Sequence, residues 1–463
     1  AYLSCGDTTS TVYVDNENIG SSMETHLVDD GVTEYEFDRV MLYGGAVLAI
    51  EPSGIGDAVV TASVGQLLGD ASGTLKVTNN RRVVGEAQPS GEAYQFDSNH
   101  QTSPVLSALG LAAGGIGYEV QWNRLYYLSD SQLLSGANVM VEAGGELVTP
   151  TRLTVTSVTL TVHGTLSGVE QLAIGPGGAV SFESAGGTSD VAGTSKVSGV
   201  YEMRRLVVDG SSTLTVKDGV SAHADSLEVV DGSIKVHGAV ALSAAHMNMT
   251  ADGEIDGSAR ATANLDRTSA GWPKNGPTSH FHRVAAGHGG QPGQWGLGTM
   301  YGSTFEPVTQ GSSGNGAFSI GGAALKIEAQ ELVLDGVISM DGGHGLSVNN
   351  GNNGGGGSGG SVLIRAGVLK GSGTAVVTVR GGDGRGDGRW GGPCGGGGGR
   401  VALYCNSTEM EGSLRGLAGL PAIKTRGGLA NGKHTGASGV AYLSCGNASS
   451  TLYADNENIN SCM

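Results

Sequence analysis

Short runs in which apolar and polar residues alternate recur along the chain. Leu214-Thr215-Val216 and Ile234-Lys235-Val236 are two examples. A period of two places successive side chains on opposite faces of a strand, so each run predicts a short strand with one buried face. No stretch of the sequence shows the sustained 3.6-residue period of an amphipathic helix. The pattern therefore predicts an all-β chain.

A motif of apolar residues ending in Asp-Gly repeats in the middle of the chain. The Asp-Gly pairs begin at Asp209, Asp231 and Asp252, so successive pairs are offset by 22 and then by 21 in the sequence. This spacing is typical of one coil of a parallel β-helix, in which glycine permits tight turns between short strands. We expect such coils over residues 136–270.

A longer period occupies the glycine-rich part of the chain. Apolar strand patterns begin at Ala323, Ser361, Arg400 and Val440, so their successive offsets are 38, 39 and 40, and glycine tracts at 354–360 and 391–399 separate them. We expect a β-helix module over 271–440, with a glycine-rich loop at one corner of each coil. Residues 1–81 are interpreted as the start of an elongated β-solenoid, and residues 82–135 as an irregular or inserted segment without a clear period.

The two ends of the sequence are alike. Residues 1–23 and 441–463 are identical at 16 of 23 aligned positions, and their offset is 440 residues. A distinctive string repeated at this distance indicates a long internal repeat, and repeats determine architecture. We interpret residues 1–440 as one repeat and 441–463 as the start of the next, within a larger protein whose export signal lies outside this sequence.

The composition argues against a nucleic-acid-binding protein and against a membrane-spanning one. The chain of 463 residues has 83 glycines, 15% charged residues and a net charge of −17. An acidic chain without a basic cluster repels phosphate backbones, so we expect no nucleic-acid partner. No apolar run approaches the roughly 20 residues needed to span a bilayer, so we expect no transmembrane segment.

The glycine-rich part contains an ordered series of short motifs. They are Gly287-His288-Gly289-Gly290, Tyr301-Gly302-Ser303, Leu332-x-Leu334-Asp335-Gly336, the tract 354–361, and Gly395 to Gly399 followed by Arg400-Val401-Ala402-Leu403. This order resembles the glycine-rich module of giant extracellular proteins of algae, choanoflagellates and other protists. The resemblance covers about residues 280–405. It implies a β-helical coat, adhesin or mastigoneme-like flagellar hair, and it supplies no catalytic residues.

Two groups of side chains are weak metal candidates. His280 and His282 would share one face of a strand, as a metal pair requires, and His288 follows them, although no carboxylate lies at ligand spacing. Asp383 and Asp387 lie in a glycine-rich string similar to a calcium-binding turn, but the string does not recur in tandem. We expect no cofactor, with calcium as the alternative.

One string is similar to an enzyme motif. Gly287-His288-Gly289 resembles the Gly-His-Gly string of polygalacturonases, which are β-helical enzymes. Their Asn-Thr-Asp motif is absent here, and the one Asp-Asp pair, Asp29-Asp30, lies far away in the sequence. We therefore expect no enzyme activity and keep polysaccharide lyase or hydrolase activity as the least favoured alternative.

Cysteines and glycosylation acceptors point to secretion. The cysteines are Cys5, Cys394, Cys405, Cys445 and Cys462, and pairings Cys405–Cys445, Cys394–Cys405 and Cys445–Cys462 all remain open. Disulfides are typical of an oxidising compartment. Acceptor sequences for N-linked glycans begin at Asn248, Asn406 and Asn447.

These observations favour a non-catalytic repeat of a secreted, filament-forming or cell-surface protein, such as a flagellar hair, a cell coat or a matrix fibre. Its expected partners are neighbouring repeats of the same chain and other copies laterally or end to end. The alternative is an adhesin or carbohydrate-binding surface protein, which would display exposed aromatic residues along one face. The expected location is extracellular or at the cell surface, the flagellum included.

Overall fold

The computed structural model describes part of the chain. The described residues are 2–4, 10–15, 25–27, 34–43, 46–50, 61–69, 74–77, 117–120, 123–126, 133–135, 139–141, 145–148, 151–157, 159–163, 165–183, 188–190, 199–262, 285–293, 299–314, 319–345, 347–348, 352–385, 394–410, 413–414, 417–418, 421–430, 435–446 and 450–457. All regular secondary structure in these residues is β-strand, which confirms the all-β prediction.

The chain divides into two compact units, residues 1–214 and 215–463. Strands of the N-terminal unit are β1 (Tyr2–Ser4), β2 (Ser10–Asp15), β3 (Thr25–Leu27), β4 (Glu34–Tyr43), β5 (Val47–Ile50), β6 (Thr61–Gly69), β7 (Thr74–Val77), β8 (Gly117–Val120), β9 (Asn123–Tyr126), β10 (Leu133–Ser135), β11 (Val139–Val141), β12 (Gly145–Val148), β13 (Arg152–Thr156), β14 (Thr159–Val162), β15 (Thr165–Ser167), β16 (Gln171–Ile174), β17 (Ala179–Phe182), β18 (Thr188–Asp190) and β19 (Val200–Asp209). β20 (Thr213–Val216) begins in this unit and ends just beyond it.

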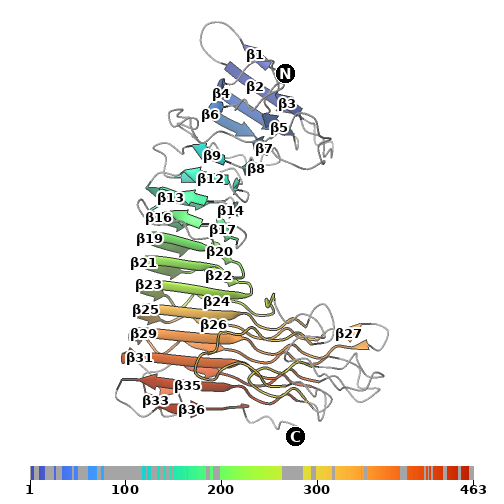
Figure 1. Cartoon of the computed structure of the whole chain (residues 1–463), viewed down its shortest axis with the longest axis vertical. Helices are drawn as coiled ribbons and strands as arrows, with labels where there is room; N and C mark the ends of the chain where they lie inside the picture. The colour runs from blue at the N-terminus through green and yellow to red at the C-terminus, as the bar shows by residue number, and fades with distance from the viewer. Residues whose placement is uncertain are drawn as a thin grey trace, which may run out of the picture. The chain divides into compact units, whose positions relative to one another are not determined.

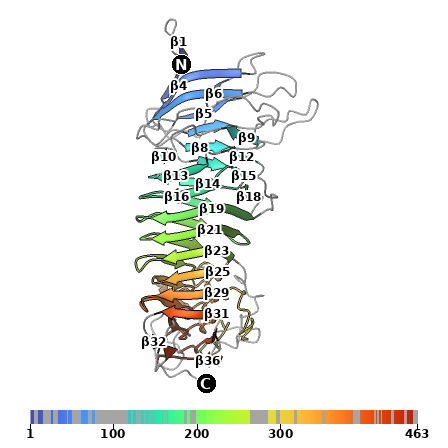
Figure 2. The ribbon, with the colours of Figure 1, turned by 90° about the vertical axis from the view of Figure 1, so that its left-hand side faces the viewer.

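The C-terminal unit contains longer strands. They are β21 (Ser221–Val230), β22 (Ser233–Val236), β23 (Ala239–Met249), β24 (Glu254–Asp256), β25 (Ala324–Leu334), β26 (Val337–Ser339), β27 (Ser347–Val348), β28 (Asn352–Asn353), β29 (Ser361–Gly371), β30 (Val376–Thr378), β31 (Arg400–Met410), β32 (Ser413–Leu414), β33 (Leu417–Ala418), β34 (Ala422–Lys424), β35 (Val440–Cys445) and β36 (Thr451–Tyr453). Figures 1 and 2 show the long strands lying one above another.

Within each unit the neighbouring strands are mostly parallel. In the N-terminal unit the strand orders are β1-β2-β4-β6, β10-β13-β16-β19, β3-β5-β7-β8-β11-β14-β17 and β18-β15-β12-β9. In the C-terminal unit they are β21-β23-β25-β29-β31-β35-β36 and β22-β24-β26-β30-β34. The hairpins β1–β2 and β35–β36 are antiparallel. In the segment without a sequence period, β8 and β9 pair in parallel with β11 and β12.

Positions that are in register on stacked strands bury their side chains one above another, in columns. In the C-terminal unit, one column contains Leu242, Ile327, Ile364, Leu403 and Leu443, which are in register on successive strands. All five side chains are buried. Each column fills the space between layers with branched apolar groups, and full burial of one such side chain contributes about 2 kcal/mol.

The register also gives the sequence spacing of successive long strands. Ala324, Ser361, Arg400 and Val440 are paired in order, so the offsets between them are 37, 39 and 40. The preceding pair is Ala239 with Ala324, whose offset of 85 is about twice as large. The chain therefore makes a long excursion between β24 and β25, and this excursion carries part of the glycine-rich sequence.

Glycine-rich segments of the C-terminal unit form a second layer beside the long sheet, which we call the glycine bundle (Figure 1). It consists of the segments 285–293, 310–314, 319–323, 340–345, 354–360, 379–385, 394–399, 424–430 and 435–439, which exchange backbone hydrogen bonds. Nearly all of their described glycines are buried. The tracts that we expected as corner loops thus include closely packed extended segments.

The hydrogen bonds of the bundle repeat every three residues. In segment 354–360, Gly356 and Gly359 donate to segment 394–399, whereas Gly357 and Gly360 donate to segment 340–345. Ser358, between these pairs, donates to a third segment through the Ser312 carbonyl. A period of three is that of a polyproline II helix, in which successive N–H groups point 120° apart. The bundle therefore bonds laterally in several directions, unlike a sheet.

Close packing explains why these positions are glycine. A Cβ on Gly356 would lie 1.8 Å from the Gly382 carbonyl oxygen, and one on Gly439 would lie 1.8 Å from that of Gly399. No described glycine of the bundle has a positive φ. Glycine is required here because a side chain would displace the neighbouring backbone, as at the axis of collagen.

Candidate functional site

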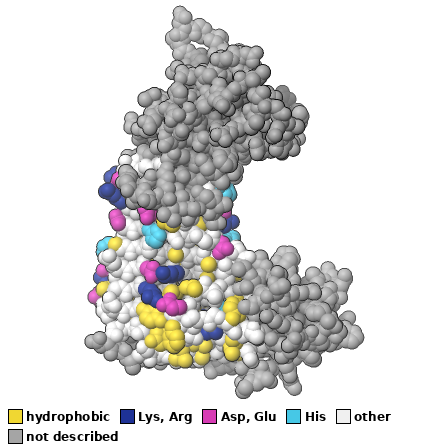
Figure 3. Space-filling view, viewed as in Figure 1, with side chains coloured by type: hydrophobic (Ala, Val, Ile, Leu, Met, Phe, Trp, Pro, Cys, Tyr) yellow, Lys and Arg dark blue, Asp and Glu magenta, His cyan; other side chains and the backbone are white. Residues whose placement is uncertain are grey.

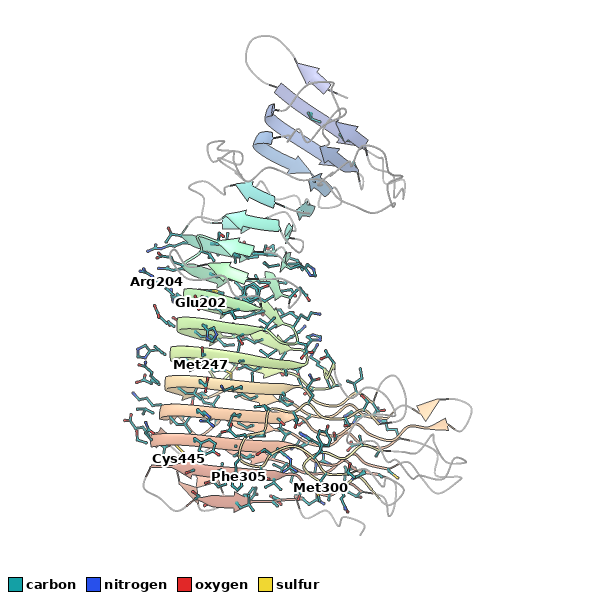
Figure 4. All side chains as sticks on the ribbon, viewed as in Figure 1. Glu202, Arg204, Met247, Met300, Phe305 and Cys445 are labelled. Carbon is teal, nitrogen blue, oxygen red and sulfur yellow. A yellow bond between two sulfur atoms is a disulfide. The ribbon has the colours of Figure 1, made fainter. Side chains whose placement is uncertain are left out.

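A segment that we call the strap, residues 299–310, crosses the outer face of the long sheet. Its Phe305 ring contacts Tyr442 of β35 edge to face, with ring centroids 4.9 Å apart, and the Phe305 carbonyl accepts from the Tyr404 hydroxyl at 2.8 Å. The Thr309 carbonyl accepts from Ser361 Oγ of β29 at 2.6 Å. The strap therefore contacts three stacked strands in turn, and Figure 4 shows Phe305 in front of them.

Arg400 fixes the middle of the strap. Its Nε donates to the Tyr301 carbonyl at 2.9 Å, and its Nη1 donates to Thr304 Oγ1 at 2.8 Å. Burial lowers the pKa of the Arg400 guanidinium, which nevertheless stays charged. These charge-assisted bonds connect the sheet with a segment that is distant in the sequence, and they order the strap.

His288 lies fully buried beneath the strap. Its Nδ1 donates to the Gly359 carbonyl at 2.8 Å, and its Nε2 accepts from Thr309 Oγ1 at 2.9 Å, so both ring nitrogens are occupied within the protein. The ring also packs against Tyr301, with centroids 4.7 Å apart. His288 thus joins the bundle to the strap as a neutral imidazole.

The pKa of His288 gives a testable pH dependence. Burial lowers this pKa from 6.5 to about 4. Between these values the unfolded chain binds more protons than the folded chain, so stability falls as the pH drops from 6.5 towards 4, by about 3 kcal/mol for this group. Denaturant unfolding of the parent and of His288→Asn should therefore differ above pH 7 and converge below pH 5. Parallel stability profiles for the two proteins would contradict this role.

Aromatic and charged groups gather on the outer face near the strap. The Arg365 guanidinium carbon lies 5.2 Å from the centroid of the Tyr404 ring, and Arg365 pairs with Glu306 of the strap. Tyr404 and Tyr442 lie with ring centroids 5.6 Å apart, and Phe305 is 56% exposed. Figure 3 shows apolar side chains collected on this unit below paired acidic and basic ones. The exposed ion pairs contribute little to stability.

A shallow groove follows the bend of the long strands beside these aromatics. Its floor contains small side chains in register on successive strands, Ala244, Ala329, Ala366 and Cys405. Tyr404, Asn406 and Arg365 line its rim. The groove is open along its length and offers aromatic, amide and guanidinium groups, which are suited to holding an extended polar ligand.

Cys405 and Cys445 form a disulfide between β31 and β35. The two residues are directly paired in the register of these strands, and their Cα atoms are 4.4 Å apart. This is one of the three pairings that the sequence left open. Cys394 lies buried in the glycine bundle, and Cys5 and Cys462 lie outside the described residues.

The residues after β36 close one end of the glycine bundle. Glu457 forms ion pairs with Arg380 at 3.1 Å and with Arg426 at 3.4 Å. Asn456 Oδ1 accepts from the Gly427 amide at 3.0 Å. We call residues 455–457 the end cap, because they provide partners for groups on two neighbouring segments of the bundle, 379–385 and 424–430.

The remaining predicted site residues do not assemble into one centre in the described structure. Asp383 accepts from the Leu429 amide at 2.7 Å and lies 3.5 Å from His344 and 3.7 Å from Arg426. Asn248 and Asn406 are exposed on the outer face of β23 and β31. His280, His282, Asp387 and Asn447 lie outside the described residues. The described part of the chain contains no group of three or more potential metal-ligating side chains.

Sequence reasoning missed the strap, the end cap and the bundle. Glu457, Arg380 and Arg426 carry no motif, although the string Asp-Asn-Glu-Asn is identical in both copies of the repeat and was therefore a signal. The contacts of the strap left no signal in the sequence, because Arg400 and Tyr301 are far apart in the chain and meet only after the long excursion folds back.

Comparison with known proteins found no matching family model, no matching characterised protein and no matching solved structure. In the described residues, no helix is long and apolar enough to cross a membrane. Function is therefore inferred from the residues of this chain.

Proposed function

We propose that the chain is a structural repeat of a secreted β-solenoid protein that forms a filament or a cell-surface coat. The observation that carries this proposal is the long repeat, in which residues 441–463 resemble residues 1–23. Both copies of the repeated string form an antiparallel hairpin with the same pairing, Tyr2 with Val12 and Tyr442 with Leu452. A unit that repeats its local structure as well as its sequence is suited to tandem stacking.

The packing of the chain supports a mechanical role. Columns of buried apolar groups, parallel ladders and the bundle's lateral hydrogen bonds all continue from one layer to the next. Such contacts connect each layer mainly with its neighbours, so that stability adds up along one dimension. The buried columns, the strap contacts and the end cap all join layers, which favours a non-catalytic scaffold.

The disulfide supports an oxidising location. Cys405 and Cys445 join adjacent strands, and disulfides persist mainly outside the reducing cytosol. The exposed acceptors Asn248 and Asn406 would be accessible to glycosylation there. An extracellular or cell-surface site, the flagellum included, is therefore part of the proposal.

Immunoelectron microscopy of cells that make this protein tests the proposal. An antibody against the C-terminal unit should label external filaments or a surface coat at regular intervals. Labelling confined to the cell interior, or to particles without periodicity, would overturn it.

The aromatic face supports a second candidate, a carbohydrate-binding adhesin. Tyr404 lines the open groove and packs near Tyr442, which in turn contacts Phe305, and aromatic rings pack well on sugar faces. A glycan array probed with the parent and with Tyr404→Ala should then show a polysaccharide class whose binding falls at least about tenfold in the variant, which corresponds to about 1.4 kcal/mol. An array without a hit would remove this candidate.

A further inference from the structure

The repeated hairpin has different surroundings in its two copies. In the first copy, β2 pairs with β1 on one side and in parallel with β4 on the other, with Val12 opposite Val40. In the second copy, β35 pairs with β36 on one side and in parallel with β31 on the other. In the described sheets, β1 and β36 are edge strands. In the first copy the β2 edge of the hairpin is paired and the β1 edge is open. In the second copy the β35 edge is paired, and the edge at β36, which is equivalent to β2, is open.

Burial of equivalent apolar side chains differs in the same way. Val12 of β2 is 3% exposed, whereas its equivalent, Leu452 of β36, is 65% exposed. Both positions keep a large apolar group, although the residues differ. An exposed leucine whose equivalent is buried marks a surface that the following coil covers.

The residues that are identical in the two copies include those that contact the preceding layers. Cys445 is bonded to Cys405, and Glu457 is paired with Arg380 and Arg426. The equivalent positions in the first copy are also cysteine and glutamate, Cys5 and Glu17. The hairpin thus keeps the groups by which it attaches to a β31-type strand and to the end of a glycine bundle.

We propose that the hairpin of residues 441–453 is the joint between consecutive repeats, and that its open edge receives a second copy of this chain's repeat. The partner is a strand equivalent to β4, which pairs with β36 as β4 pairs with β2 and covers Leu452. The disulfide to Cys405 and the end cap attach the same hairpin to the repeat before it. This inference rests on the proposed function, since it requires tandem repeats.

The joint also reverses the chain direction. β35 is parallel to β31, β36 is antiparallel to β35, and the incoming strand is parallel to β36, by analogy with β2 and β4. The first long strands of the following repeat therefore run opposite to β29 and β31. Each repeat thus differs from its predecessor in strand direction at this point, and the apolar pair of Leu452 with the equivalent of Val40 sets the register of the joint.

A tandem protein tests the joint. It consists of this full chain followed directly by a copy of its residues 24–463, and the single chain is the reference. Hydrogen exchange of the amides at 451–453 of the first repeat, which lie at the joint, should be at least about tenfold slower in the tandem than in the single chain. Leu452→Asp should leave the melting temperature of the single chain unchanged. The same substitution in the first repeat of the tandem should lower the melting temperature of the tandem and abolish the slowed exchange.

Val12→Asp is the matched control, because its position is covered already in the single chain and the melting temperature should fall in both proteins. Equal exchange at 451–453 in the tandem and the single chain, with no effect of Leu452→Asp in either, would overturn the joint. Neither result depends on whether the natural protein forms a filament, so the joint and the proposed function can fail separately.

Discussion

Gly356→Ala is expected to disrupt the glycine bundle and lower the free energy of unfolding by about 3 kcal/mol. The added methyl group would lie 1.8 Å from the Gly382 carbonyl oxygen and 2.5 Å from its carbon. These are backbone atoms fixed by hydrogen bonds to other segments, so no side chain can rotate away. Denaturant unfolding followed by circular dichroism measures the loss.

Gly219→Ala is the control for this substitution. Gly219 has a φ of +76°, but no atom lies within 4 Å of the Cβ position. Only the conformational penalty of a left-handed residue applies, which is about 1 kcal/mol. If Gly356→Ala is no more destabilising than this control, the bundle is not closely packed at segment 354–360.

Reduction of the Cys405–Cys445 disulfide is expected to have the second large effect. The bond joins two cysteines at a sequence separation of 40, and the chain-entropy model assigns about 4 kcal/mol to a closure of this length. The double variant Cys405→Ala/Cys445→Ala should therefore unfold β35 and β36 at a lower temperature than the parent. Thermal unfolding with and without reductant measures the difference.

The same double variant provides the internal control, because reductant should no longer change its melting temperature. An unchanged melting temperature of the parent under reduction would show that β31 and β35 are held by their hydrogen bonds and buried leucines alone. That outcome would contradict the disulfide as an attachment of the repeated hairpin.

Alternation of apolar and polar residues sufficed to predict the strands, because burial of one face leaves a direct trace in the sequence. Arg400 and Val440 were expected to begin equivalent strands of successive coils, and they are paired in register. The first strand of this series, β25, was expected to begin at Ala323, but its pairing with β29 begins with Ala324 opposite Ser361. Sequence propensity does not fix the end of a strand.

The glycine bundle could not be predicted in the same way. The period of three is visible only in the hydrogen bonds, because successive backbone amides donate to different neighbouring segments. Glycine has no side chain, so this period leaves no pattern of apolar and polar residues in the sequence. Phe305 and Tyr442 belong to segments far apart in the chain, and their contact depends on how the excursion folds back. Long-range contacts of this kind leave no local pattern.

Electron microscopy of proteins with one, two and three repeats shows whether tandem repeats form one continuous solenoid. If the repeats stack through the hairpin joint into a continuous solenoid, the particles should be straight rods whose length increases by the same increment with each added repeat. Particles in which the repeats adopt variable angles, or whose length does not grow with repeat number, would contradict stacking through the hairpin joint.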